Sequence, residues 1–433
     1  MNSSTWLALA AAVGIAPTAV KAATVEASAT TVLIARPEAS RGVAVPTAPL
    51  LELVDVSARD IDVGPAQDVR VKLSAWGRWH VLGGLAEGSQ GQVRAPSVQD
   101  RLGADLQLLY AEARVLERRL LVRAGRQLIY DGSTPRVVHV DGASVDARIA
   151  RGFGVRAYGG APVTPLFGPR QGDLQTGARL YYSPSFGNEV GASYTYGVGG
   201  GTLSRHEVGL DGRWGVLRNV LLTGAGLWSL ADSRLVEAEI MPRWFVRPNV
   251  ELYAQLRRTA PDLWLPRTSI LSVFADDERD ELGGGVYWEP TRRLSLDASG
   301  RALRMVEGSG YDLRARGTYR LGFRNRAQVG AEVRQFDVPE NGYVLGRVFA
   351  THRITERLFV ACDGDVYFLQ EPINGETRSL AASASVGWSF LPGWRASVSG
   401  VAGSDPTFDR RFELLARVGY QFATTSRSRG DDQ

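Results

Sequence analysis

Apolar and polar residues alternate with a period of two along most of this 433-residue chain, from about Val69 to Phe422. In the segment 311–321, Tyr, Leu, Ala and Gly at odd positions alternate with Asp, Arg and Thr at even positions. Successive side chains of a β-strand point to opposite faces, so this pattern predicts amphipathic strands. Because no stretch of helical length shows a period near 3.6 residues, the pattern predicts an all-β fold.

Short turns rich in Pro, Gly and Asn alternate along the chain with longer polar segments, among them 83–103, 197–204, 259–280, 303–310 and 369–377. Long and short connections alternate in outer-membrane barrels, where short turns face the periplasm and long loops face outward. The spacing predicts a transmembrane up-and-down antiparallel β-barrel of about 20 strands, with 18 as the alternative. Both chain ends are then expected on the periplasmic side.

The two faces of the predicted strands differ in chemistry. One face carries Val, Leu, Trp, Tyr, Phe, Ala and Gly, and the other carries Arg, Glu, Asp, Ser and Gln. A lipid-facing exterior around a wet lumen explains both faces, and the mean hydropathy of −0.12 is their average. A sheet in lipid must close, since every backbone group has to pair internally. The soluble alternatives are a propeller, which would show a blade repeat, or another secreted β-protein.

The pattern divides the chain into four parts. Residues 1–22 contain a short apolar run and a small-residue cleavage site, which predict a signal peptide. Residues 23–66 are rich in Ala, Val, Pro and Ser and are expected to form an irregular periplasmic lead-in. The barrel is expected over residues 67–422, and residues 423–433 are expected to form a polar C-terminal tail.

The last predicted strand ends with alternating aromatic residues. Phe412, Tyr420 and Phe422 resemble the C-terminal signal of bacterial outer-membrane proteins, a final amphipathic strand read by the barrel-assembly machinery. The tail after Phe422 departs from that pattern, because such proteins usually stop at the aromatic residue. The resemblance implies the outer membrane of a Gram-negative bacterium as the location, with its lipid and the assembly machinery as partners.

A second resemblance covers about 20 residues. Gly125-Arg126-Gln127, then Tyr130, Gly132 and Arg136, and then Asp141-Gly142-Ala143 resemble a stretch of the alginate-export-type porins. The Trp/Asn segment expected before the Asp-Gly pair is missing. The resemblance implies movement of an anionic polysaccharide through an Arg-rich lumen.

Two lysines, Lys21 and Lys72, leave 48 of the 50 basic residues as arginine. The alternation places many arginines inward. The candidate pore-lining residues are Arg123, Arg156, Arg179, Arg213, Arg314, Arg316, Arg320, Arg334, Arg347, Asp363 and Asp365. A basic lumen with a low-dielectric wall concentrates anions, which predicts a weak anion preference. The alternative is that these charges pair across strands and only keep the lumen wet.

Several functions are excluded or disfavoured by the residues present. One cysteine cannot form an intramolecular disulfide, and the four histidines are too far apart for a local metal motif. No serine is marked as a nucleophile, and the arginines are spread rather than clustered for nucleic-acid binding. We therefore expect no catalytic site, cofactor, metal or nucleic-acid partner.

The sequence predicts a passive channel for small hydrophilic solutes, anionic solutes among them. The alternatives are a polysaccharide-export-type porin and a structural or adhesive barrel that its own loops plug.

Overall fold

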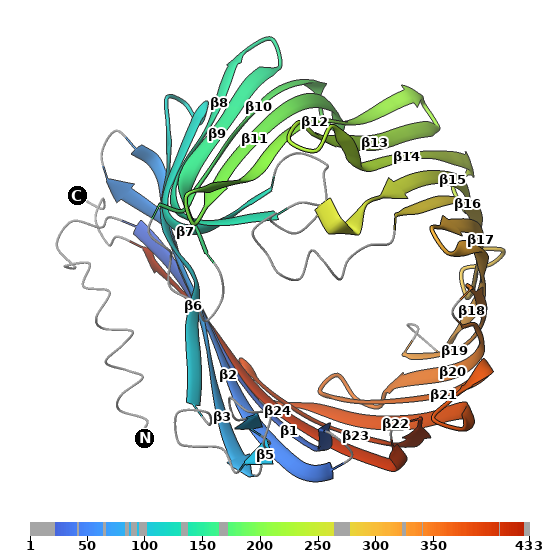
Figure 1. The fold of residues 1–433 in the computed structure, drawn as a ribbon. Coiled ribbons are helices and arrows are strands. Elements are labelled where there is room, and N and C mark those ends of the chain that lie inside the picture. The colour runs from blue at the N-terminus through green and yellow to red at the C-terminus, as the bar shows by residue number, and fades with distance from the viewer. Residues whose placement is uncertain are drawn as a thin grey trace.

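The alternating segments form antiparallel strands, each paired with its neighbours in the chain (Figure 1). A computed structural model describes residues 22–40, 43–63, 66–82, 86–87, 93–94, 102–130, 137–163, 172–263, 278–322, 326–339, 341–406 and 408–427. In this part of the chain the fold is all-β apart from one turn of 3-10 helix, η1 (Pro261–Leu263). No helix of the described residues is long and apolar enough to cross a membrane.

Twenty-two strands form one sheet. They are β1 (Ala22–Ser40), β2 (Val43–Val63), β3 (Ala66–Leu82), β6 (Leu102–Val115), β7 (Leu120–Tyr130), β8 (Val137–Ala150), β9 (Phe153–Pro162), β10 (Leu174–Ser185), β11 (Asn188–Gly199), β12 (Thr202–Leu217), β13 (Val220–Ser229), β14 (Arg234–Arg247), β15 (Val250–Thr259), β16 (Arg279–Trp288), β17 (Leu294–Met305), β18 (Gly308–Leu321), β19 (Ala327–Asp337), β20 (Tyr343–Arg353), β21 (Leu358–Ile373), β22 (Glu376–Leu391), β23 (Trp394–Asp405) and β24 (Phe408–Arg427). A separate small hairpin pairs β4 (Ala86–Glu87) with β5 (Val93–Arg94).

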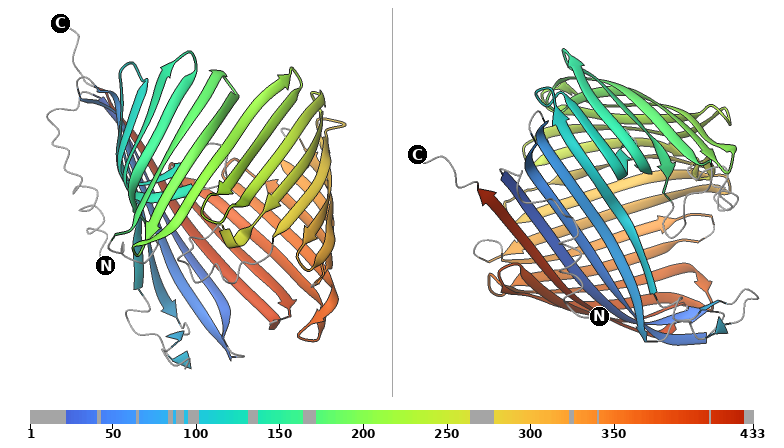
Figure 2. Two further views of the ribbon diagram at one scale, coloured as in Figure 1. Left: turned by 45° about the horizontal axis from the view of Figure 1, so that its top comes forward. Right: turned by 90° about the vertical axis from the view of Figure 1, so that its left-hand side faces the viewer.

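The first and last strands pair and close the sheet into a barrel of tilted strands (Figure 2). The register of β1 and β24 runs without a shift from the pair Ala22 and Arg427 to the pair Ala35 and Leu414. Closure satisfies the backbone of both would-be edges, which is the condition for a sheet in lipid.

The predicted strand number of about 20, and the alternative of 18, are both too low. Strands β1 (Ala22–Ser40) and β2 (Val43–Val63) lie where an irregular lead-in was predicted, so that prediction is wrong. In β1 the outward residues include Ala27 and Ala29 and the inward ones Ser28 and Thr30, which differ little in hydropathy. The alternation is therefore nearly invisible in the sequence, although the backbone pairs fully.

The barrel also extends past its predicted C-terminal bound, because β24 continues to Arg427 rather than ending at Phe422. The predicted tail is shorter as a result, and residues 428–433 lie outside the described residues. The predicted signal peptide lies outside them as well, except for Ala22, which begins β1.

The short turns at one end of the barrel are confirmed, for example between Ala150 and Phe153 and between Leu391 and Trp394. At the other end, several connections predicted to be long are two-residue turns. The segments 197–204, 303–310 and 369–377 are mostly strand, with only two residues between β11 and β12, β17 and β18, and β21 and β22. Strand ends that extend beyond the lipid band contact water on both faces and are therefore polar on both faces. Without alternation of apolar and polar residues, their sequences resemble those of loops.

Aromatic side chains gather on the outward face near the end with the short turns. Ring centroids are 5.6 Å apart between Trp388 and Phe390, 6.0 Å between Phe390 and Trp394, and 4.6 Å between Trp394 and Tyr420. Phe412, Tyr420 and Phe422 share this outward face of β24 and are exposed. The arrangement matches an interfacial aromatic girdle.

We expect Thr30→Pro to prevent barrel closure, because residue 30 pairs with Gly419 in β24 and Leu53 in β2. Proline removes the backbone donor of a ladder hydrogen bond and is found almost only on edge strands or at bulges. The measurement is heat-modifiable migration on electrophoresis after refolding. Thr30→Ala, which keeps the N–H, should migrate like the parent, and a folded Thr30→Pro band would contradict the closure.

Candidate functional site: the charged lumen

The register places every candidate pore-lining residue on the polar, inward face of its strand. Arg314 lies opposite Arg334, Arg316 lies opposite Glu332, and Arg347 lies opposite Asp365. The positions are Arg123 on β7, Arg156 on β9, Arg179 on β10, Arg213 on β12, Arg314, Arg316 and Arg320 on β18, Arg334 on β19, Arg347 on β20, and Asp363 and Asp365 on β21. Their role in conduction stays a prediction.

The acidic and basic side chains of this face lie at different depths. Among the described residues, the buried charged side chains are Glu112, Arg179, Glu207, Asp211, Glu237, Glu281, Asp312 and Glu332. Seven of these eight are acids, while the arginines that hold them reach further toward the lumen. Arg301, for example, has 35% of its side chain exposed above Asp312, which has 4%.

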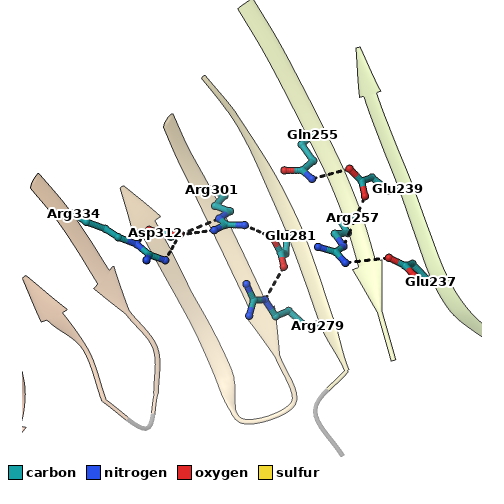
Figure 3. Close-up of polar contacts among 9 residues, drawn as sticks. All are labelled: Glu237, Glu239, Gln255, Arg257, Arg279, Glu281, Arg301, Asp312 and Arg334. Atoms are coloured by element: carbon teal, nitrogen blue, oxygen red, sulfur yellow. Dashed lines mark hydrogen bonds and ion pairs between the residues drawn. The ribbon is translucent and has the colours of Figure 1, made fainter. Parts of the chain in front are cut away.

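Arginines and acids form two groups of contacts, one across β16 to β19 and one between β14 and β15 (Figure 3). Arg301 donates to Glu281 at 3.0 Å and to Asp312 at 2.7 Å, and Arg334 donates to the other oxygen of Asp312 at 2.8 Å. On the neighbouring strands Arg257 lies 3.1 Å from Glu237. Each buried acid is therefore neutralised by at least one longer guanidinium.

Pairing across strands is thus extensive, as the alternative interpretation of the sequence expected. It does not make the lumen surface neutral, because the carboxylates lie beneath the guanidiniums. Water in the lumen meets the basic partner of most pairs, and the longer reach of arginine is the physical reason.

Arg179 is the exception among the candidates. Its side chain is 1% exposed and is held by Asp211 through two bonds of 2.9 and 2.7 Å and by Glu189 at 2.7 Å. It lies on the inward face but does not present its charge to lumen water. Arg179 is better described as a structural cation of the wall.

Two candidate arginines, Arg316 and Arg347, lie over the same aromatic ring. The guanidinium carbon of Arg316 lies 4.6 Å from the ring centroid of Phe349, and that of Arg347 lies 5.8 Å from it. Arg347 also donates to Asp363 at 2.6 Å. Stacking fixes the direction of a long side chain without removing its charge, so these arginines are held facing the lumen.

One cluster of charged residues lies at the rim, where wall strands β14, β15 and β16 begin or end. Arg234 at the start of β14 contacts Asp262 at 3.0 Å and also Glu278, which precedes β16. Arg258 lies 2.7 Å from Glu278. The hydrogen bond from Arg234 and the charge of Arg258 hold the pKa of Glu278 below its ordinary value, so this carboxylate stays charged and keeps the two flanks of residues 264–277 together.

A hairpin inside the barrel was not predicted from the sequence. The ends of β7 and β8 turn from the wall toward the barrel interior (Figure 1). Ile129, Val138 and Val140 are buried and form a cluster with Tyr158 of the inner wall. Tyr130 accepts a hydrogen bond at its carbonyl from Arg156, at 2.7 Å, so the hairpin lies over the wall.

Three glycines make this bend possible. Gly125 has a φ of 119°, which other residues rarely adopt. A Cβ on Gly142 would lie 2.0 Å from the carbonyl oxygen of Gly159, and one on Gly160 would lie 2.4 Å from that of Asp141. Only glycine lets the strands approach this closely.

The resemblance to alginate-export-type porins falls on this hairpin. Arg126 holds Asp141 through two bonds of 2.7 and 2.8 Å, and Gln127 is fully buried and accepts from Ser144 at 2.7 Å. The paired Gly-Arg-Gln and Asp-Gly were the available sequence signal for the bend. Gly132 and Arg136 lie outside the described residues.

Comparison with known proteins supports the fold class. No protein-family model matches the sequence, and a search of curated proteins found no similar sequence. The translocation pore of the P pilus usher PapC is similar in structure, with a TM-score of 0.51 at 7% identity over 92% of this chain and 99% of that chain. The chain therefore has the fold of a large closed β-barrel.

Pseudomonas aeruginosa proteins give weaker similarities. OccK3 (OpdO) has a TM-score of 0.46 at 11% identity over 94% of this chain and 97% of that chain. The outer membrane protein OpdK has a TM-score of 0.46 at 8% identity over 93% of this chain and 99% of that chain.

We expect Asp312→Asn to lower the free energy of unfolding by about 3 kcal/mol, because it leaves two guanidiniums, Arg301 and Arg334, facing each other without their buried anion. Denaturant unfolding in lipid vesicles, followed by tryptophan fluorescence, measures this. Asp363→Asn is the matched control. Its side chain is 25% exposed and holds only Arg347, so its loss should stay below about 1 kcal/mol. Equal losses of unfolding free energy in the two variants would contradict the difference in burial between Asp312 and Asp363.

Proposed function

We propose that this protein is a passive channel in the outer membrane of a Gram-negative bacterium, and that it passes small hydrophilic solutes with a preference for anions. The observation that carries the proposal is the layering of the lumen wall, where buried carboxylates lie beneath exposed arginines. No catalytic group is part of this function.

The membrane location is supported by the outward face. Large apolar side chains there are exposed around the barrel, including Leu210, Leu256, Leu282, Val333 and Val348, each more than half exposed. An exposed apolar surface of this extent is normally in contact with another apolar phase, and lipid surrounds a closed barrel on all sides. The similar PapC structure is a translocation pore, which agrees with a pore at the centre of such a fold.

The anion preference follows from the exposure of guanidinium groups, rather than carboxylates, to the water of the lumen. Field lines from exposed guanidiniums are focused by the low-dielectric wall and raise the local anion concentration. The buried acids contribute less to that field at the lumen axis, because each is paired with a guanidinium that lies closer to the lumen, as Glu237, Asp312 and Glu332 are. Arginine also binds carboxylate and phosphate groups in a bidentate manner, so weak contacts along the wall favour such solutes.

Reversal potential in a KCl gradient across a planar bilayer tests the proposal. We expect stable conductance steps and a potential of the sign that chloride permeation gives. Potassium selectivity would contradict the anion preference, and a folded, heat-modifiable sample without conductance would contradict the channel.

A double variant that replaces two arginines by neutral residues gives a residue-level test. Arg213 and Arg316 hold no buried acid in the described contacts, so Arg213→Gln/Arg316→Gln removes lumen charge without exposing a buried carboxylate. We expect the chloride-to-potassium permeability ratio to fall by about two-fold. The matched control, Arg218→Gln/Arg292→Gln, removes two charges from turns outside the wall and should leave the ratio unchanged. An equal fall in the control would refute the assignment of selectivity to the lumen.

Two alternatives remain proposals with distinct outcomes. Export of an anionic polysaccharide draws on the resemblance at residues 125–143, and it predicts that uronic-acid oligomers block the chloride current. A loop-plugged structural or adhesive barrel predicts no current at all. The extent of the arginine surface favours the channel over the plug, because a plug has no need of a charged lumen.

The barrel-assembly machinery is proposed as the folding partner. Phe412, Tyr420 and Phe422 present their rings on the outward face of β24, where a receptor for the final strand can reach them. Outer-membrane lipid then covers the same face in the mature protein.

A further inference from the structure

A hollow of about 760 Å³ lies at the end of the barrel that carries the short turns. Its lining comes from the turns that join β6 to β7, β8 to β9 and β10 to β11, and from the wall beside them. The wall residues Asp146, Arg156 and Tyr181 lie on the inward face, so the hollow belongs to the mouth of the lumen. Small-molecule sites commonly have volumes of about 300–1,000 Å³.

The acids that line this hollow are already neutralised by the wall. Asp146 accepts from Arg156 at 2.7 Å through one oxygen and from the hydroxyl of Tyr181 at 2.7 Å through the other. Glu189 lies 2.7 Å from the guanidinium of Arg179. Neither carboxylate is therefore free to neutralise a further cation.

A glycine permits the arrangement around Asp146. Gly154 lies opposite Arg148 of β8 and opposite Tyr181 of β10. A Cβ on Gly154 would lie 2.2 Å from the ring of Tyr181. The ring therefore covers the glycine, and its hydroxyl reaches Asp146 two strands away. Arg148, the next inward residue of β8, is left without that carboxylate.

Three arginines of the turns line the same hollow. Within the described part of the chain, Arg148 and Arg151 form neither an ion pair nor a side-chain hydrogen bond. Arg119 lies 3.9 Å from Glu117, but their side chains are 66% and 82% exposed, so water weakens this attraction. The hollow therefore has an excess of guanidinium charge.

Backbone contacts fix the turns that carry these arginines. The N–H of Arg148 donates to the carbonyl of Arg119 at 2.7 Å, and the N–H of Ser183 donates to the carbonyl of Gly152 at 2.8 Å. Arg151 and Gly152 have φ values of 51° and 89°. A turn of this kind favours Asn, Asp or Gly at both positions, so the turn itself does not account for an arginine at 151.

We propose that this hollow binds the phosphate group of a small soluble phosphomonoester at the short-turn mouth of the lumen. Arg148 and Arg151 contact the phosphate, Arg119 adds a third positive charge, and the hydroxyl of Ser183 lies in the same lining. The site rests on the channel function proposed above, because its ligand is a solute of the lumen.

The charge of the site favours a phosphomonoester over other anions. Such a group carries about −1.5 to −2 charges at pH 7 and offers three acceptor oxygens. Two guanidiniums can each bind it in a bidentate manner. A carboxylate has two oxygens and one charge, and the phosphodiester of a phospholipid also has one charge. The inward lining by Asp146, Arg156 and Tyr181 favours a lumen solute over a lipid headgroup.

Equilibrium dialysis of radiolabelled glucose 6-phosphate tests the site, with the full-length protein refolded in a non-ionic detergent. We expect saturable binding of one molecule per chain and no competition by glucose. Arg148→Gln/Arg151→Gln should weaken binding by about ten-fold or more, because it removes two charged hydrogen-bond donors. Heat-modifiable migration shows that the variant is folded. Arg151→Gln alone should weaken binding by about three-fold or more, which keeps the test decisive if the double variant does not fold.

The matched control is Arg292→Gln/Arg293→Gln, which removes two charges from the turn between β16 and β17 at the same end of the barrel. It should change the affinity by less than about two-fold. An equal loss in the control, or no saturable binding by the parent protein, would overturn the site.

Competition identifies the ligand class. Succinate and a short-chain phosphatidylglycerol should each compete about ten-fold less well than unlabelled glucose 6-phosphate. Equal competition by either would overturn the assignment to a soluble phosphomonoester. Chloride conductance in planar bilayers separates the two proposals. Conductance without phosphate binding refutes the site and leaves the channel, whereas binding without conductance refutes the channel function.

Discussion

The pairing of backbone amides and carbonyls around the closed wall is the constraint on which this structure depends. A sheet with an edge cannot lie in lipid, so β1 must pair with β24. Closure fixes which side chains face outward and which face inward. The apolar exterior, the aromatic girdle and the charged lumen all follow from this alternation of outward and inward side chains.

The inward polarity then sets the electrostatics. Neighbouring strands place arginines and acids side by side, and their different lengths separate them by depth. Asp312 and Glu281 lie at the wall, while Arg301 and Arg334 cover them. A wall of nearly balanced composition can therefore present a basic surface to water, which a count of charges along the chain does not reveal.

Much of the fold could be predicted from alternation, because strands such as β18 contrast strongly between Tyr or Leu and Arg. The inward direction of the arginines could be predicted from the same alternation of apolar and polar residues. Strands β1 and β2 could not be predicted, since Ala, Ser and Thr differ too little in hydropathy to show a period. The inward hairpin was also missed, because its cause is the close approach of Gly125, Gly142 and Gly160, which arises from tertiary contacts.

Closure by β1 is tested most directly by a disulfide across the seam. Ala27 and Phe422 are opposite each other in the register of β1 and β24. In a Cys362→Ser background, Ala27→Cys/Phe422→Cys should crosslink on mild oxidation in the folded, heat-modifiable form and not after denaturation. A folded barrel whose two thiols stay reduced, and react freely with a maleimide, would contradict the 22-stranded closure.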